Sequence, residues 1–269
     1  MAGTLVVFHA HPDDESIATG GVMAQAAAEG RRVVLVLATK GEHGEVAEGF
    51  LEPGERLEDR RVAETMRAAE ILGVARVEFL GYRDSGMEGT PENDAPGSFW
   101  AADVDEAAER LAAILRDEDA EVLTVYDDNG GYGHPDHIQV HRVGVRAAEL
   151  AGTRRVYEST IDRDEMQRLM RERLAEALRD GTELPGDLQD ADNLTIGVPA
   201  HQITTEIDVS EFVERKRAAL AAHASQVDES SFFLAMSAED FRLAFGREWF
   251  IHRGVTPGPR ESSLFATDK

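Results

Sequence analysis

Continuous apolar runs alternate with helical stretches over the first 160 residues, and this alternation limits the folds open to the chain. The runs at residues 4–8 (TLVVF) and 31–38 (RRVVLVLA) lack the every-other-residue pattern of a half-exposed strand. Such runs are typical of strands covered on both faces. A helical stretch separates the two runs, which favours a parallel pair. We therefore predict an α/β fold with a Rossmann-like, doubly wound, mostly parallel sheet.

The remaining elements follow from the same patterns of periodicity and breaker residues. A sheet order of 3-2-1-4-5 is assumed for the first five strands, by analogy with other doubly wound sheets. Further strands are expected at 77–80, 121–126 and 155–157, with additional strand structure within 194–209. Helices are expected at 20–29, 55–72, 103–115, 136–151, 166–178, 211–224 and 238–245.

We predict one domain over residues 1–269, because a chain of this length can bury a single large core. Residues 1–160 would form the Rossmann-like core, and residues 161–256 a smaller C-terminal α+β portion that shapes the site. Residues 257–269 are expected to be a disordered tail. The charge-rich stretch 162–192 could be a lid over the site, but a solvated surface helix is the favoured interpretation.

Composition narrows the range of partners and chemistries. The formal charge of −24 opposes binding to nucleic-acid phosphate and to anionic lipid. No segment approaches the roughly 18 apolar residues of a membrane span, and the first residues lack a basic leader, so we expect a cytoplasmic protein with a small-molecule partner. Self-association into a homo-oligomer is left open. The absence of cysteine removes disulfides, thiolate metal sites and thiol nucleophiles.

Two runs of nearly the same letters each follow an expected strand: residues 11–14 (HPDD) and 134–137 (HPDH). Either run alone could be a simple turn, because proline fixes φ and aspartate caps helices. Together they indicate one site, since ligands bind beyond the carboxyl ends of strands in such sheets. Imidazole and carboxylate are the ligands that a divalent cation takes when cysteine is absent. We predict that His11, Asp14 and His137 bind a metal and leave one position for water.

Hydrolysis at such a centre needs a base and a group that stabilises the oxyanion. Asp13 is the candidate base because it adjoins a ligand yet is free to face the water. His134 is expected to donate, as an imidazolium, to the developing oxyanion. Asp136 is expected to hold His134 oriented and charged. These roles describe metal-assisted hydrolysis of an amide or ester.

Two other classes of protein compete with this interpretation. Two histidines and one carboxylate also form the triad of non-haem Fe(II) oxygenases, but those sites usually occupy β-barrels. A nucleotide-binding module is disfavoured, because no G-x-G-x-x-G follows the first strand and no Walker lysine is present. The remaining histidines are interpreted as packing or surface residues: His9, His43, His141, His201, His223 and His252.

The segments HAHPDDES (9–16) and GGYGHPDH (130–137) resemble the PIG-L or LmbE-like family of zinc-dependent N-acetylglucosaminyl deacetylases. Within that family the chain is most similar to the mycothiol branch, which contains an N-acetylglucosaminyl-inositol deacetylase and a mycothiol S-conjugate amidase. Other segments extend the similarity over nearly the full chain: TKGEHGEV (39–46), RRVAE (60–64), YRDSGMEGT (82–90), TVYDDNGGYGHPDH (124–137) and KRAALAAHASQ (216–226).

The resemblance implies one Zn²⁺ per chain, for which Fe²⁺ could substitute, with the ligands and catalytic residues named above. It also implies three substrate-binding residues, namely Arg61, Asp84 and Tyr132. The amidase has a lysine where this chain has IAT (17–19), whereas SQVDESSFF (225–233) is closer to the amidase. We therefore expect N-deacetylation of an N-acetylglucosamine-containing glycoside. The alternative is a conjugate amidase or an antibiotic-biosynthesis amidase.

Overall fold

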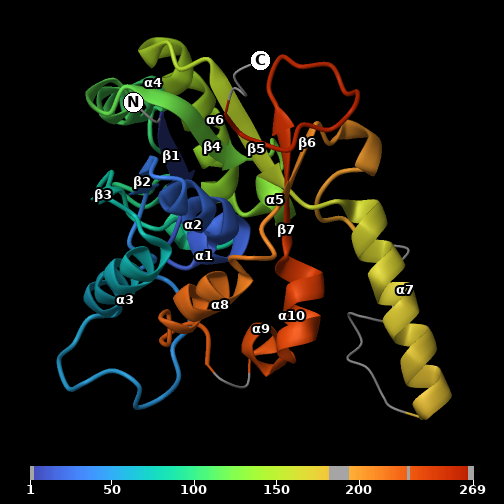
Figure 1. Ribbon diagram of the computed structural model, residues 1–269. Helices are drawn as coiled ribbons and strands as arrows, with labels where there is room; N and C mark the ends of the chain where they lie inside the picture. Colours follow the sequence, from blue (N-terminus) through green and yellow to red (C-terminus); the bar gives the residue numbers. More distant parts are fainter. Residues whose placement is uncertain (1–2, 182–193, 229–230, 266–269) are drawn as a thin grey trace.

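A seven-stranded sheet runs through the molecule in the order β3-β2-β1-β4-β5-β7-β6 (Figure 1). The computed structural model describes residues 3–181, 194–228 and 231–265. The first five strands are parallel, and their order confirms the predicted 3-2-1-4-5. These strands are β1 (Thr4–His9), β2 (Arg32–Leu37), β3 (Arg76–Phe79), β4 (Ala120–Tyr126) and β5 (Arg155–Thr160).

Helices cover both faces of the sheet (Figure 1). Every residue of β1 is buried, and its side chains alternate between two cores. Val6 and Phe8 pack with α4 and α6, whereas Leu5 and Val7 pack with α2, α3 and α8. The continuous apolar run therefore marks a strand buried on both faces, as predicted. The helices are α1 (Asp14–Ala18), α2 (Gly20–Ala28), α3 (Leu57–Leu72), α4 (Val104–Asp117), α5 (Gly130–Gly133), α6 (Pro135–Ala151), α7 (Arg163–Asp180), α8 (Val213–Ala221), α9 (Phe232–Ala235) and α10 (Ala238–Phe245).

Local sequence accounts for several helix ends. The Asp103 side chain accepts a hydrogen bond from the Glu106 N–H and so caps α4. Helix α3 ends at Gly73, whose φ of 80° is a left-handed conformation that glycine adopts without a steric penalty.

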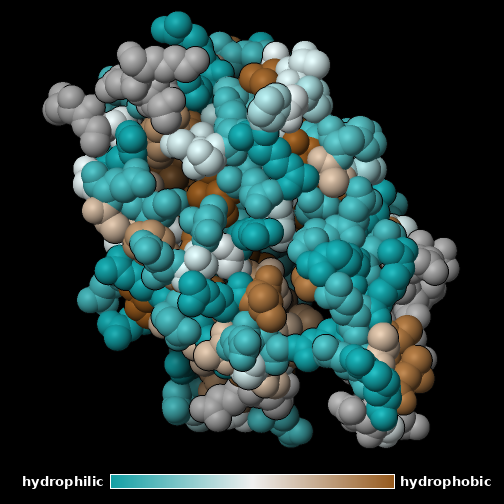
Figure 2. Space-filling view, turned by 45° about the vertical axis from the view of Figure 1, so that its right-hand side comes forward, coloured by the Kyte–Doolittle hydropathy of each residue, from teal (hydrophilic) through white to brown (hydrophobic). Residues whose placement is uncertain are grey.

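The described residues contain no helix that combines the length and the apolar character of a membrane span. The face shown in Figure 2 is largely hydrophilic, as expected for a chain of this charge.

The C-terminal portion extends the same sheet. Strand β7 (Arg247–His252) pairs antiparallel with β5, and β6 (Thr205–Asp208) pairs antiparallel with β7. Of the strand structure expected within 194–209, β6 is the part that forms. Helix α7 is longer than the predicted 166–178 and projects from the body (Figure 1). Residues 182–193 of the predicted lid or surface segment lie outside the described residues.

The prediction of a disordered tail from residue 257 is wrong for residues 257–265. The Glu261 N–H donates to the Thr204 carbonyl at 2.7 Å, and the Glu261 carbonyl accepts from the Glu206 N–H at 2.9 Å. Leu264 and Phe265 are buried in the core on the α2 face. The proline and glycine residues of this segment predict turns. The local sequence does not reveal that strand β6 supplies hydrogen-bond partners and that the core supplies packing partners. Residues 266–269 lie outside the described residues.

Candidate metal centre

The two HPD runs converge because β1 and β4 are hydrogen-bonded neighbours. Parallel strands end at the same edge of a sheet, so the loops after β1 and β4 meet there. The imidazole centroids of His11 and His137 lie 5.4 Å apart, and His134 lies 4.7 Å from His11 and 5.1 Å from His137. The predicted convergence of the two runs is therefore confirmed.

Asp14 lies between the two histidines expected to be its fellow ligands. Its Oδ2 is 3.3 Å from His11 Nδ1 and 3.4 Å from His137 Nε2. Metal bonds of about 2.0–2.2 Å in a tetrahedral arrangement place neighbouring ligand atoms about 3.4 Å apart. Both separations thus match what two ligands of one small cation require.

A second pattern of donors also fits a cation. Among the described residues, His11, His134 and His137 bring ligand atoms within 4.8 Å of one another, and so do His11, Asp84 and Asp136. The set of His11, Asp14 and His137 does not form such a compact group. His11 is the member common to both groups, and His137 joins it in the first. For a set built on His11 and His137, the third donor is either His134 or Asp14.

The ring of His137 has a nitrogen left free for a ligand bond. Its Nδ1 lies 3.2 Å from the Gly130 carbonyl, so this nitrogen carries the proton and donates. The other nitrogen, Nε2, is buried without a hydrogen-bond partner and lies 3.4 Å from Asp14 Oδ2. A Cβ at residue 130 would lie 2.6 Å from the His137 Cβ, so the close approach requires glycine. A ring fixed through one nitrogen, with the other left without a hydrogen-bond partner, is what a metal ligand needs.

His11 is held from its opposite side by carboxylates. Its Nε2 lies 3.1 Å from Asp136 Oδ2 and 3.5 Å from Asp84 Oδ1. Burial disfavours the imidazolium, but hydrogen bonds to Asp136, Asp14 and Asp84 raise the pKa of His11 well above its usual value. A carboxylate on the far nitrogen of a histidine fixes the ring and increases its basicity as a ligand. The donor set therefore fits a divalent cation.

Asp13, the predicted base, faces the site from a backbone in the left-handed region, with φ of 91°. Arg61 donates to this carboxylate, with its Nη2 3.3 Å from Asp13 Oδ2. The same guanidinium also donates to the Pro12 carbonyl at 2.6 Å and to the Gly41 carbonyl at 2.7 Å. Burial raises the pKa of Asp13 to about 6, against the lowering effect of Arg61. The carboxyl group is therefore ionised for the most part at neutral pH.

The expected partnership of His134 with the Asp136 carboxylate is wrong. His134 is the N-cap of α6, and its Nδ1 accepts from the Asp136 backbone N–H at 3.1 Å. The Asp136 carboxylate instead accepts from the Ser85 N–H at 2.9 Å and the Ser85 hydroxyl, and contacts His11. Burial is the largest cause that lowers the pKa of His134, and the nearby charges of His11 and His137 lower it further, to about 4. His134 is thus neutral, with its proton on Nε2, rather than the expected imidazolium.

The three residues expected to bind substrate differ in their surroundings. Arg61 is buried, and its guanidinium is engaged by the backbone carbonyls of two loops. Asp84 is also buried and accepts from the backbone N–H groups of His43 at 3.1 Å and Gly86 at 2.8 Å. Tyr132 is 55% exposed, and its ring centroid lies 5.0 Å from that of His137. Tyr132 is therefore the one of the three that presents a free surface beside the site.

A cavity of about 530 Å³ opens beside the metal-binding side chains. Its polar end contains Asp13, Asp14, Tyr132 and His137. A buried ion pair lies in its wall, with Lys216 Nζ 2.6 Å from Glu248 Oε1. The apolar part of the wall comprises Ile17, Ala18, Ile161, Met166, Ile196, Phe232, Phe233, Ala244, Phe245 and Trp249. The first turns of α7 thus reach the site through Met166.

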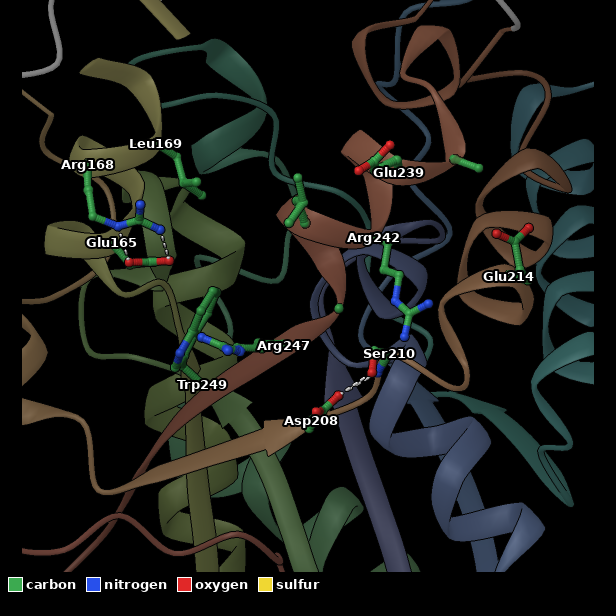
Figure 3. Close-up of a pocket in the computed structure, with 13 residues that line it drawn as sticks. Glu165, Arg168, Leu169, Asp208, Ser210, Glu214, Glu239, Arg242, Arg247 and Trp249 are labelled. Atoms are coloured by element: carbon green, nitrogen blue, oxygen red, sulfur yellow. Dashed lines mark hydrogen bonds and ion pairs between the residues drawn. The ribbon is translucent and has the colours of Figure 1, made fainter. Parts of the chain in front are cut away.

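A second hollow, of about 700 Å³, lies between α7, β6, α10 and β7 (Figure 3). It shares Arg247 and Trp249 with the first cavity. Arg168 pairs there with Glu165, as Figure 3 shows. Among the described residues, His137 of the metal-capable donor groups lines the first cavity, and no member of these groups lines the second hollow. The second hollow therefore adjoins the site without containing its chemistry.

Sequence reasoning missed a layer of side chains behind the ligands. The Tyr126 ring stacks on His137, with centroids 4.2 Å apart, and its hydroxyl lies 2.9 Å from His9 Nδ1. His9 is fixed in turn by Thr19, whose hydroxyl lies 2.8 Å from Nε2. The prediction that His9 is a packing residue is confirmed by its burial. Its packing role is to support the site, a role for which strand β1 alone offers no signal.

The fold and the buried donor set define an α/β protein with a candidate metal centre at the carboxyl edge of its central strands. The chain belongs to the GlcNAc-PI de-N-acetylase (PIG-L) family, which its sequence matches over residues 6–148. This membership confirms the family resemblance found in the sequence. A relative from Acidothermus cellulolyticus, 1D-myo-inositol 2-acetamido-2-deoxy-alpha-D-glucopyranoside deacetylase, is 43% identical; the alignment covers 99% of this chain and 95% of the relative.

Solved structures share the fold at lower sequence identity. The N,N'-diacetylchitobiose deacetylase from Pyrococcus horikoshii is 20% identical with a TM-score of 0.59, covering 93% of this chain and 84% of that one. GalB, a 4-carboxy-2-hydroxymuconate hydratase from Pseudomonas putida, is also 20% identical, with a TM-score of 0.55 and coverage of 98% and 100%. A hydratase and a deacetylase thus share this architecture, so fold alone does not define the reaction.

Proposed function

We propose that this protein is a metal-dependent deacetylase that removes the N-acetyl group from an N-acetylglucosamine-containing glycoside of the inositol type. The observation that carries the proposal is the buried Nε2 of His137, which has no hydrogen-bond partner and lies beside Asp14, in the wall of a cavity that Asp13 also lines. The name of the 43% identical relative supports the choice of substrate. Family membership supports an enzyme acting on an amide bond.

The chain's own side chains can perform the proton transfers of amide hydrolysis. A divalent cation held by His11 and His137, with Asp14 as third ligand, would acidify water and polarise the amide carbonyl. Asp13 is ionised at neutral pH and can accept a proton from the attacking water. The same proton is then available to the departing amine when the C–N bond breaks, giving acetate and a free amine.

His134 contributes as a neutral donor. Because its Nδ1 accepts from the Asp136 N–H, its Nε2–H is free to hydrogen-bond the carbonyl oxygen as negative charge develops there. A donor aimed at this developing charge stabilises the transition state more than the substrate. Tyr132, exposed beside His137, is placed to contact the sugar. We propose sugar binding by Arg61 and Asp84 only through loops that they organise, since both are already engaged by backbone groups.

Zn²⁺ is the proposed cation, one per chain, because nitrogen and oxygen donors in a set of three with an open position suit it. Fe²⁺ suits the same donors, since selectivity among divalent ions depends partly on availability. The proposed partner is a small glycoside rather than nucleic acid or membrane, in keeping with the charge of −24. A cytoplasmic location remains part of the proposal.

The test is incubation of the metal-loaded protein with N-acetylglucosaminyl-inositol, with detection of both the freed amine and acetate. Equal amounts of the two products, abolished by a chelator and restored by Zn²⁺ or Fe²⁺, are expected. Absence of amine release with either metal would contradict the proposal. Oxygen uptake dependent on Fe²⁺, with no acetate formed, would instead indicate an oxygenase.

The apolar wall of the cavity favours a second candidate, an amidase for a larger acyl group. Ile17 and Ala18 line the cavity next to Asp13 and Asp14, and Phe233 and Phe245 continue the wall. An acetyl methyl group needs far less apolar surface than this. A series of N-acyl glucosaminyl-inositols with increasing chain length separates the candidates. A kcat/KM that falls with chain length supports the deacetylase, and one that rises supports the amidase.

A further inference from the structure

Asp13 has a backbone conformation that its residue type disfavours. Its φ is 91°, and Asp119 is the other non-glycine residue with positive φ in the part of the chain that the structure describes. A side-chain-bearing residue in this region is strained, and such strain persists only where surrounding contacts impose it. The conformation places the Asp13 carboxylate in the wall of the cavity, beside that of Asp14.

A carboxylate two residues further along holds the Asp13 backbone. Glu15 Oε2 accepts from the Asp13 N–H at 3.0 Å, and the Glu15 side chain is fully buried. Arg61 secures the preceding peptide through its hydrogen bond to the Pro12 carbonyl at 2.6 Å. The left-handed turn is therefore fixed by one acceptor on its N–H and one donor on the carbonyl before it.

Glu15 is itself fixed by a histidine from the C-terminal portion. His223 Nε2 lies 2.7 Å from Glu15 Oε1, and the Ser16 hydroxyl donates to the same oxygen at 2.7 Å. His223 follows α8, which packs against α1 (Figure 1). Its side chain is fully buried. Burial opposes the charged form of His223, but Glu15 raises its pKa above the usual value. The two side chains thus form a hydrogen-bonded pair with no access to solvent.

We propose that Glu15 and His223 are positioning residues for Asp13. The pair directs one carboxylate oxygen at the Asp13 N–H, holds the backbone in its left-handed turn and so aims the Asp13 carboxylate at the metal centre. Overall stability alone does not call for such a pair, because apolar side chains of similar volume stabilise a buried site as well or better. What apolar side chains cannot supply is the directed acceptor. The kinetic test of this inference rests on the proposed deacetylase function.

Replacement of His223 separates positioning from general stability. In His223→Leu the Glu15 carboxylate loses its partner, and kcat is expected to fall roughly tenfold to a hundredfold, the scale of a misplaced catalytic group. KM and the amount of bound metal are expected to stay near the wild-type values. His223→Gln keeps an N–H that can donate to Glu15, and we expect it to recover most of kcat. A His223→Leu variant that changes KM and leaves kcat intact would overturn the inference.

Glu64 offers a matched control in the same region. It is a buried carboxylate that binds the Ser225 N–H at 2.9 Å and the Ser225 hydroxyl at 2.6 Å, two residues beyond His223. Glu64→Leu loosens the same turn after α8 but removes no hydrogen bond to the Asp13 backbone. At temperatures where both variants are folded, Glu64→Leu is expected to keep kcat much closer to wild type than His223→Leu does. Equal losses of kcat would indicate a merely structural role.

A double-mutant cycle gives a sharper criterion. If His223 acts only through Asp13, His223→Leu has no further effect on the residual rate of Asp13→Ala, because the group being positioned is gone. Additive losses in the double variant would overturn the inference.

Crystal structures of metal-loaded wild type and His223→Gln and His223→Leu variants provide a readout that does not depend on turnover. The inference expects Asp13 to keep a positive φ in wild type and His223→Gln and to leave the left-handed region in His223→Leu. Retention of the wild-type Asp13 conformation in His223→Leu would overturn it. If wild type shows no amide hydrolysis, the proposed function fails, while these structures still decide the positioning role.

Discussion

The two HPD runs share their first three residues but build different structures. In the first run, α1 begins at Asp14, and the preceding Asp13 is left-handed. In the second, α6 begins at Pro135, with His134 as its N-cap. The helix thus starts three residues after the first histidine and immediately after the second. The motif therefore supplies the imidazole and carboxylate groups, and the position at which the helix begins decides which way each of them points.

The aspartates of the two runs show the consequence. Asp13 lines the cavity, held by Glu15 and Arg61. Asp136 occupies the same third position of its run but points away from the cavity, toward Ser85 and His11, and is fully buried. One aspartate is therefore available to substrate, and the other supports a ligand from behind.

The largest contrast is expected between the histidines of the second run. His137→Ala removes a proposed ligand whose Nε2 has no other hydrogen-bond partner, so we expect loss of bound metal and of essentially all activity. His134→Ala is expected to keep the metal and lose about 10²–10³-fold in kcat, as when one oxyanion donor is removed. Metal analysis after dialysis, paired with turnover, measures both. If His134→Ala loses its metal instead, His134 rather than Asp14 completes the ligand set.

The next contrast concerns the base. Asp13→Ala should keep its metal but lose about 10²–10⁴-fold in rate. Since the pKa of Asp13 is raised to about 6, the ionised, active form builds up as pH rises through that value, and a bound cation lowers the midpoint. A plot of kcat/KM against pH should therefore fall on the acid side, and this limb should vanish in Asp13→Ala. Wild-type rates in the variant would remove Asp13 from the mechanism.

Asp136→Asn is expected to have a smaller effect. The amide cannot match the carboxylate as an acceptor for His11 Nε2–H, so metal affinity should weaken by about 10–100-fold. At saturating metal, kcat should recover most of its value, because Asp136 does not contact the cavity. Metal titration followed by kinetics checks this. A loss of kcat that saturating metal does not correct would return Asp136 to a catalytic role.

The smallest effect on activity is expected at His9, two positions before the first histidine, because it does not line the cavity. Burial lowers the pKa of His9 to about 4, whereas Tyr132, two positions before the second histidine, is exposed. Unfolded His9 titrates near pH 6.5, so between pH 6.5 and 4 the unfolded chain binds the extra proton and stability falls on acidification, by at most about 3 kcal/mol.

Denaturant unfolding across that pH range measures the His9 contribution. His9→Gln should flatten the pH dependence of the free energy of unfolding, with Tyr132→Phe as the control that leaves it unchanged. An unaltered slope in His9→Gln would show that another group causes the acid sensitivity.

Much of the fold could be predicted because its signals are local. The apolar runs of β1 and β2 predict strands buried on both faces, and Gly73 indicates the end of α3. The site was predictable as far as the ligand loops, since strand ends and donor residue types are both visible in sequence. The family resemblance named Arg61 as a substrate-binding residue, but its burial depends on carbonyls of two distant loops, which the local sequence does not reveal.

The sequence by itself determined the parallel core and the two loops that carry the donor groups, because apolar periodicity and residue chemistry act over short stretches of chain. The strand order was taken from analogy with other doubly wound sheets, and the structure confirmed it. Tertiary structure alone decided that Asp136 supports His11, 125 residues away, and that His223 holds Glu15 across 208 residues. The physical reason is that a buried polar group must find its hydrogen-bond partner inside the fold, and that partner is chosen by packing rather than by neighbours in sequence.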